Sequence, residues 1–213
     1  MSHTLGIRQA QKQKTRQALL DAALQLLEEQ SLSSLGLREV TRAVGVAPTA
    51  FYRHFRDMAD LGVALVEEAL SSLHTTLVAL LAATGDSEGD DEGEERIAAT
   101  VELIVVYVRT HPAHVRFIAR EQHGGVQAVR SAIGGQLTLF AREVKDQFAR
   151  EPESAGWDED DLLMLARMYV DHMVMTASAL LEASPDTEER VAASARRQLR
   201  LVSLGRRHWL DER

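Results

Sequence analysis

The stretch from Leu37 to Phe55 constrains the fold of this chain more than any other part of it. It reads LREVTRAVGVAPTAFYRHF, a short amphipathic pattern followed by a tight turn at Gly45-Val46. Pro48 suits the first turn of a second helix, because its missing N–H would have no partner there. Two short helices joined by a tight turn form a helix-turn-helix, whose second helix enters the major groove of DNA. We therefore predict that this part of the chain binds DNA.

A preceding helix over residues 10–30 would complete a three-helix unit. Its apolar residues recur at helical spacing and form one stripe, made of Ala18, Leu19, Ala22, Ala23, Leu26 and Leu27. The next two helices are expected to bury Leu37, Val40, Ala43, Val44 and Val46, and then Phe51 and Phe55. Ala47 is a poor N-cap for the third helix, so we expect the two phenylalanines to hold that helix by packing.

Positive charge gathers at this end of the chain. The net charge is −8, yet residues 1–56 hold eight Lys or Arg against four acids, a balance of +4 that leaves −12 for the rest. Lys12, Lys14 and Arg16 fall in the first turns of the predicted 10–30 helix, where cations oppose the helix dipole and an outside anion would be favourable. A basic head on an acidic body would attract DNA phosphates to the head and repel them from the rest of the chain. The alternative is that the basic residues of the first helix are simply solvated.

Composition predicts an all-α protein. Of 213 residues 45% are hydrophobic, only four are proline, and no segment alternates apolar with polar residues between turn signals. The chain has no cysteine, which excludes disulfides and thiolate metal sites and fits a cytoplasmic protein. The N-terminus lacks the apolar core of a signal peptide, and no uncharged apolar run has membrane-spanning length. We expect a cytoplasmic protein with no membrane contact and no cofactor.

Residues 57–213 predict a larger helical body behind a head of residues 1–56, for about nine helices in all. Asp57 is a good N-cap for a helix to about Ala83, and further helices are predicted over residues 96–109, 113–123, 126–150, 157–182 and 185–210. Thr84 to Glu95 is expected to be a solvated acidic loop without a binding role. Gly134-Gly135, inside a predicted helix, indicates a bend or a close approach. The last two helices carry more apolar surface than one domain needs, which predicts a homodimer through them.

The pattern of the first sixty residues resembles the TetR family of bacterial repressors. The resemblance rests on Lys14-Thr15-Arg16 and Ala22-Ala23, on Leu37-Arg38-Glu39-Val40 with Ala43 and Gly45-Val46, and on Phe51-Tyr52-Arg53-His54-Phe55. It implies a two-fold dimer with an N-terminal helix-turn-helix in each subunit and a helical body that encloses an effector pocket. The family pattern usually has a lysine three residues after the His-Phe pair, where this chain has Met58, so Arg53 or Arg56 would supply that phosphate contact.

Two segments narrow the resemblance to the FabR and DesT branch, which regulates genes for unsaturated fatty acid synthesis. They are APTAFYRHFRD at residues 47–57 and RFIAREQHG at residues 116–124. Because the second segment lies outside the predicted head, we take it to bear on the ligand. The branch implies long-chain acyl-CoA or acyl-ACP as the effector. A ligand in the body would then tilt the long helix from Asp57 and change the spacing of two recognition helices that must match major grooves about 34 Å apart.

The candidate DNA contacts follow from side-chain chemistry. A recognition helix from Pro48 to Phe55 would present Thr49, Ala50 and Tyr52 to base edges or phosphates, with methyl groups for thymine and a hydroxyl for phosphate. Arg53 and His54 would face the backbone, and Arg38 a base or phosphate. Lys14 and Thr15, with the N-terminus of the first helix, would clamp the strand on the other side. For His54, simple capping of the helix C-terminus stays open.

Apolar residues of the body offer a candidate lining for an acyl chain, although ordinary core packing is the alternative for each. They are Val101, Ile104, Val105, Val108, Phe117, Leu137, Phe140, Met164 and Met168. Methionines adapt their shape, which suits a pocket that tells straight from bent chains. Arg116, Arg120 and Arg130 are the candidates to bind the phosphates of a CoA or carrier-protein arm, a solvated or salt-bridged surface being the alternative.

Three other functions compete with this interpretation. An enzyme or metal site could use His111, His114 and His123, or Asp171-His172, but no third ligand has a telling spacing and adjacent helix residues point about 100° apart. The sequence therefore predicts no catalytic residue and no metal site. A regulator of an efflux or catabolic operon that answers to a drug or metabolite would have the same head. A helical interaction module that never meets DNA would show no salt-dependent duplex binding.

Overall fold

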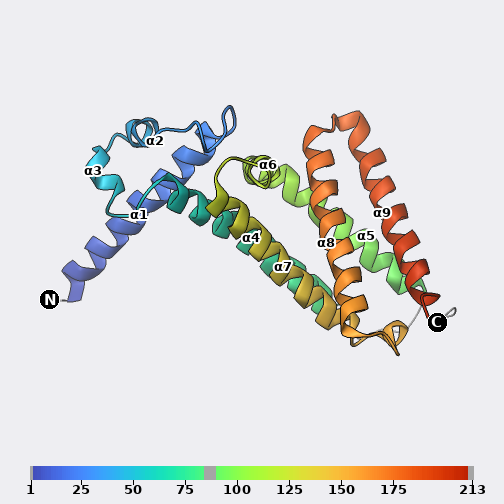
Figure 1. Ribbon diagram of the computed structural model, residues 1–213. Coiled ribbons are helices and arrows are strands. Elements are labelled where there is room, and N and C mark those ends of the chain that lie inside the picture. The colour runs from blue at the N-terminus through green and yellow to red at the C-terminus, as the bar shows by residue number, and fades with distance from the viewer. Residues whose placement is uncertain (1, 84–89, 211–213) are drawn as a thin grey trace. The chain divides into compact units, whose positions relative to one another are not determined.

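The computed structural model describes residues 2–83 and 90–210, and within these residues all regular secondary structure is helical (Figure 1). The helices are α1 Ser2–Leu26, α2 Leu37–Val44, α3 Pro48–Phe51, α4 Met58–Ala83, α5 Asp90–Thr110, α6 Pro112–Glu121, α7 Gln127–Phe148, α8 Glu159–Glu182 and α9 Pro185–Arg207, with a 3₁₀ turn η1 at Pro152–Ser154. The predicted all-α fold with about nine helices is confirmed for the described residues. No helix among them is both long enough and apolar enough to cross a bilayer.

Two predicted boundaries were wrong at helix N-termini. α1 begins at Ser2, so Lys12, Lys14 and Arg16 lie in the middle of a helix and do not oppose a dipole at its first turn. α5 begins at Asp90, and residues 90–95 of the predicted acidic loop are therefore helical; residues 84–89 lie outside the described part. Acidic side chains interact favourably with the positive end of a helix dipole, which is why an acid-rich segment can start a helix as well as form a loop.

The described residues pack as two compact units. The first consists of residues 1–69 and 116–133, and the second of residues 70–115 and 134–213. α4, α6 and α7 each contribute to both units. The predicted division after residue 56 separates a DNA-binding part from an effector-binding part. It concerns function, not packing, and it stays a prediction. The packing places the second half of α6 with the head, so the segment from Arg116 to Gly124, which we took to bear on the ligand, belongs to the first unit.

In the first unit, local chemistry sets the turns and packing sets the short helices. α1 packs on α2, and α2 on α3. Gly45 ends α2 with φ +73°, a left-handed conformation that glycine adopts at little cost, and its N–H bonds to the carbonyls of Arg42 and Thr41. Ala47 provides no side-chain cap for α3, as expected. Asp57 Oδ1 accepts from the N–H of Asp60 at 2.8 Å, which confirms the predicted cap of α4.

The second half of α6 is tied to the turn that follows α1 by polar groups. Arg120 Nη1 donates to the carbonyl oxygens of Leu27 (2.8 Å) and Gln30 (2.7 Å), and Nη2 to that of Glu28 (3.3 Å). Glu121, which is almost completely buried, accepts from the N–H of Leu32 at 2.9 Å through Oε1. A helix end leaves carbonyls without partners, and cations near it are favourable. Arg120 therefore caps the end of α1 and the turn that follows it from a distant part of the chain.

In the second unit, α5 packs against α8 and α9, which also pack on each other. Two apolar clusters lie among its described residues. One joins residues of α7 and α8, namely Phe140, Ala141, Val144, Phe148, Leu162, Leu165, Ala166 and Val170. The other joins α5, α8 and α9 with the first half of α6, through Val101, Ile104, Val105, Val108, Val115, Leu180, Ala192, Ala195 and Leu199. Tyr169 and Met173 pack against both clusters.

A buried ion pair fastens the end of α9 within this unit. Arg206 is 7% exposed, and its Nη1 lies 2.6 Å from Glu151 Oε2, while Arg96 reaches the other oxygen of Glu151 at 3.2 Å. The Arg206 guanidinium also lies over the Phe148 ring, 4.8 Å from its centroid. A buried charge is tolerated when it is paired and hydrogen-bonded, so this network holds the C-terminal helix in one position.

No described segment packs closely against Gly134 and Gly135, the two glycines inside α7. A Cβ placed on Gly134 or Gly135 would meet no atom of another described segment within 4 Å, so the predicted close approach is not made by the described residues. Gly62 in α4 differs, because a Cβ there would lie 2.7 Å from Val129 Cγ2 and would also overlap Leu32. Of these three glycines, Gly62 is the one that packing requires.

Replacing Gly134 by Ala should raise the free energy of unfolding by about 0.5–1 kcal/mol, because alanine restricts the unfolded chain more and fills open space. The matched variant Gly62→Ala should lower it by about 1–3 kcal/mol through overpacking. Urea denaturation followed by circular dichroism measures both. A destabilised Gly134→Ala variant would show that another molecule, such as a second subunit, occupies that space.

Candidate functional site

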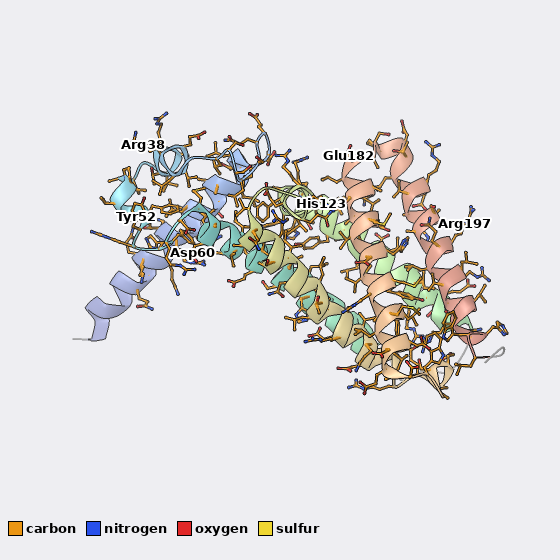
Figure 2. All side chains as sticks on the ribbon, in the orientation of Figure 1. Arg38, Tyr52, Asp60, His123, Glu182 and Arg197 are labelled. Carbon is orange, nitrogen blue, oxygen red and sulfur yellow. The ribbon has the colours of Figure 1, made fainter. Side chains whose placement is uncertain are left out.

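The predicted DNA contacts all belong to the first unit, and most are open to solvent. Arg38 of α2 and Tyr52 of the turn after α3 are labelled in Figure 2, and both side chains are exposed. Exposed with them are Lys14, Pro48, Thr49 and Arg53, while Thr15, Ala50 and His54 are partly buried. The structure thus leaves free the side chains that a duplex would have to reach. Their contact with DNA stays a prediction.

The segment after Pro48 is shorter as an α-helix than predicted. α3 ends at Phe51, and the chain continues to Phe55 as turns in which His54 N–H bonds to the Phe51 carbonyl at 2.8 Å. Phe51 is fully buried and Phe55 nearly so, with their ring centroids 5.5 Å apart, which confirms them as core residues. Tyr52 is 64% exposed and meets Phe51 edge-on at 5.8 Å. The buried rings therefore orient the exposed side chains between them.

α1 contributes cations beside this segment. The Arg16 guanidinium carbon lies 5.2 Å from the centroid of the Phe55 ring, a distance typical of a cation–π contact. Thr15 Oγ1 donates to the Gln11 carbonyl at 3.1 Å, as threonines inside helices commonly do. Because α1 starts at Ser2, its N-terminus is more than two turns before Lys14 and is not the clamp that we expected beside Lys14 and Thr15.

Met58 stands at the first residue of α4, where the family pattern has a lysine nearby. Of the two arginines proposed to substitute, Arg56 is engaged with Asp60, since its Nη2 lies 3.0 Å from Asp60 Oδ1. The backbone N–H and side chain of Arg56 hold the pKa of Asp60 below its ordinary value. Arg53 is exposed and forms no described ion pair, so Arg53 is the better candidate for a phosphate contact.

The predicted pocket residues do not form one group. Val101, Ile104, Val105 and Val108 lie in the cluster of α5, α8 and α9, while Leu137 and Phe140 lie with the other cluster of the second unit. Phe117 is buried but belongs to the first unit. Met164 and Met168 of α8 are 42% and 48% exposed, so these two methionines do not line the interior of this chain, contrary to our expectation. Apolar residues at helical spacing mark an apolar face of a helix, but the spacing does not show whether that face packs inside the same chain or against another molecule.

The three predicted phosphate-binding arginines all have partners within the first unit. Arg120 caps α1, Arg116 Nη1 lies 3.6 Å from Glu28 Oε2, and Arg130 Nη1 donates to the Gly124 carbonyl at 2.5 Å. A ligand phosphate would have to compete with these contacts, most of all at Arg120. Arg116 therefore fits the alternative interpretation, a salt-bridged surface residue.

Polar groups inside the second unit were missed by sequence reasoning. Burial raises the pKa of Tyr107 to about 12 and also raises that of Tyr169, whose ring packs against both apolar clusters. His172 Nε2 is enclosed, and no described atom hydrogen-bonds to it; Thr176, four residues on, is also buried. The spacing of Tyr169, His172, Met173 and Thr176 on one face of α8 was the available signal.

Comparisons with known proteins agree with this geometry. Residues 19–65 match the family described as bacterial regulatory proteins, tetR family. The solved structure of the transcriptional regulator FadR from Bacillus subtilis in complex with stearoyl-CoA is similar, with a TM-score of 0.67 and 14% identity over 87% of this chain and 96% of that one. The fatty acid degradation regulator FadR from Bacillus halodurans gives 0.65 and 15% identity over 88% and 93%. NalD, a repressor of the MexAB-OprM multidrug efflux pump of Pseudomonas aeruginosa, gives 0.62 and 20% identity over 88% and 96%.

Replacing Arg120 by Met should lower the free energy of unfolding by about 1–3 kcal/mol, because three carbonyl groups at the end of α1 lose their donor. Hydrogen exchange should become faster first in residues 27–36. Arg197→Met is the matched control, since Arg197 is exposed on α9 (Figure 2), and it should change stability by less than about 0.5 kcal/mol. Equal effects of the two substitutions would contradict the capping role.

Proposed function

We propose that this chain, whose N-terminal domain is that of TetR-family regulators, is a dimeric transcriptional repressor that binds a palindromic operator and responds to a long-chain acyl thioester. Regulators of this family bind DNA and are not enzymes. The proposal assigns to the chain an operator, a second copy of itself and an effector, acyl-CoA or acyl-ACP. It also places the target genes in lipid metabolism, as the likeness to the FabR and DesT branch implies.

The observation that carries the DNA-binding role is the exposed set around α3. Arg53, Tyr52 and Thr49 project from a backbone that Phe51 and Phe55 anchor, with Lys14 of α1 in the same unit. A docking surface of this kind needs side chains held at fixed spacing, because phosphate contacts set the register and base contacts the sequence. The short exposed side chain of Thr49, with the cations Arg53 and Lys14 in the same unit, suits a surface that enters a major groove.

The dimer is supported by apolar side chains that this chain leaves uncovered on its last two helices. Met164, Met168 and Met175 of α8 and Leu201 and Leu204 of α9 are exposed, from 42% to 71%. Large apolar groups gathered on neighbouring helices mark an interaction surface, and a two-fold axis lets one patch cover itself. A second copy of the chain is the partner that the proposal assigns to this face.

The lipid effector is supported by the character of the second unit. Tyr169 and Met173 lie where its two apolar clusters meet, and His172 offers an unsatisfied nitrogen on the same helix. An apolar interior with a few polar groups is the usual character of a ligand site. The similar structure of Bacillus subtilis FadR contains stearoyl-CoA, which makes an acyl thioester the first ligand to test.

A drug or small metabolite is the second candidate effector. The contacts of Arg116, Arg120 and Arg130 within the chain favour it, since they leave no unpaired arginine among the three that were predicted to hold CoA phosphates. The fold is shared with an efflux-pump repressor, so the helices alone do not choose between the two.

The DNA-binding role predicts a change in salt dependence. A duplex is first selected from random DNA by the wild-type protein, and its affinity is measured by fluorescence anisotropy at several salt concentrations. Arg53→Gln should reduce the slope of log K against log salt by about 0.9 per head, because one phosphate contact is lost. Arg197→Gln, on the body, should leave the slope unchanged. Recovery of no duplex by the wild-type protein would refute the proposed function.

The effector role predicts ligand-dependent stability. Palmitoyl-CoA and oleoyl-CoA should raise the melting temperature, because a ligand that binds only the folded state adds about 2.7 kcal/mol of stability at a hundred times its Kd. Free CoA, which lacks the acyl chain, is the control and should have little effect. If hydrophobic drugs raise the melting temperature and acyl-CoAs of every length do not, the efflux alternative replaces the lipid role.

A further inference from the structure

His54 lies in an unusual setting at the end of the Phe51–Phe55 segment. Its Nδ1 atom is enclosed by the protein, and no described atom forms a hydrogen bond with it. The ring centroid lies 6.4 Å from that of Phe55, over which Arg16 is placed. A ligand would therefore meet the imidazole through Nε2. The helix-capping role that we left open would need a ring nitrogen bonded to a carbonyl, and no such bond is described.

Positive charges surround this imidazole. Burial lowers the pKa of His54 below its ordinary value, and Lys12, Arg16 and Arg53 lower it further by electrostatic repulsion. Lys12 and Arg16 approach from α1, and Arg53 precedes His54 in the chain. The nearest carboxylates along the chain are engaged elsewhere, since Asp60 pairs with Arg56 and Asp57 caps α4. In the free protein, burial and the three nearby cations thus disfavour the protonated form of the imidazole.

A DNA phosphate would change this balance. It carries a full negative charge near the same cations and offers an oxygen acceptor to an imidazole N–H. An opposite charge within about 4–6 Å favours the protonated form of a histidine, and a hydrogen bond to that form favours it further. We propose that His54 takes up a proton when the head binds a DNA phosphate, so that operator affinity rises as the pH falls.

The inference rests on the proposed function and adds proton linkage at one residue to it. The direction follows from linkage, because the DNA-bound state holds more protons than the free state wherever DNA raises the pKa of His54. Uptake of one full proton per head would change affinity by about tenfold per pH unit and per head. Partial uptake gives a smaller slope of the same sign. The phosphodiester groups of DNA stay ionised near neutral pH, so they take up no proton on binding.

Calorimetry of DNA binding at pH 7 tests the proposal. The wild-type protein is titrated with the selected duplex in buffers of different ionisation enthalpy, and the dependence of the heat on the buffer gives the number of protons taken up. We expect uptake by the wild type and its loss, by up to one proton per head, in His54→Gln. His123→Gln is the matched control, because His123 is exposed in the same unit (Figure 2) and should leave the uptake unchanged.

A second variant and a second measurement keep the test decisive. Lys12→Gln removes one of the repelling cations, so the NMR titration midpoint of the free His54 imidazole should rise. NMR titration of the His54 ring in the wild-type protein, with and without DNA, should show a higher midpoint in the complex. Equal uptake in wild type and His54→Gln, or equal midpoints, would overturn the inference while leaving DNA binding intact. Absence of any duplex binding would overturn the proposed function itself.

Discussion

The burial of Phe51 and Phe55 is the interaction on which the candidate DNA surface depends. α3 has only four residues and no side-chain cap, and a helix of that length does not persist by its own hydrogen bonds. Two buried rings replace what the backbone cannot supply, and Arg16 covers one of them. Tyr52, Arg53 and His54 then stand between these anchors. Their positions are consequences of core packing rather than of helix propensity, so core substitutions at either phenylalanine would disturb the candidate DNA-contacting side chains together.

The same unit receives part of its structure from a distant segment. Arg120 and Glu121 of α6 satisfy backbone groups at the end of α1 and at Leu32, in the turn that leads to α2. The segment from Arg116 to Gly124 carried part of the resemblance to lipid regulators, and we first associated it with the ligand. In the structure its best-defined contacts are with the head. A motif outside a helix-turn-helix can therefore reflect how the head is held as well as what the body binds.

In the body, some apolar side chains point into the core and others point outward. Val101 and Val105 are buried among α5, α8 and α9, whereas Met164 and Met168 face outward on α8. Both sets looked alike as apolar stripes. Tyr169 and His172 add polar groups to the interior of the second unit, and the exposed methionines leave apolar side chains uncovered on α8.

The sequence by itself determined the all-α class, the turn at Gly45, the cap at Asp57 and the burial of Phe51 and Phe55, because each depends on local geometry or on strongly periodic apolar residues. It did not determine where α1 begins, since Ser2 to Gln9 carry no decisive signal. It misjudged Ala43, which is exposed, while Thr41 is buried and bonds to the Leu37 carbonyl. Only the tertiary structure decided that Arg120 caps α1, that the pocket residues divide between clusters, and that cations surround His54. These are contacts between residues far apart in the chain, and the periodicity of one helix holds no information about which neighbour it meets.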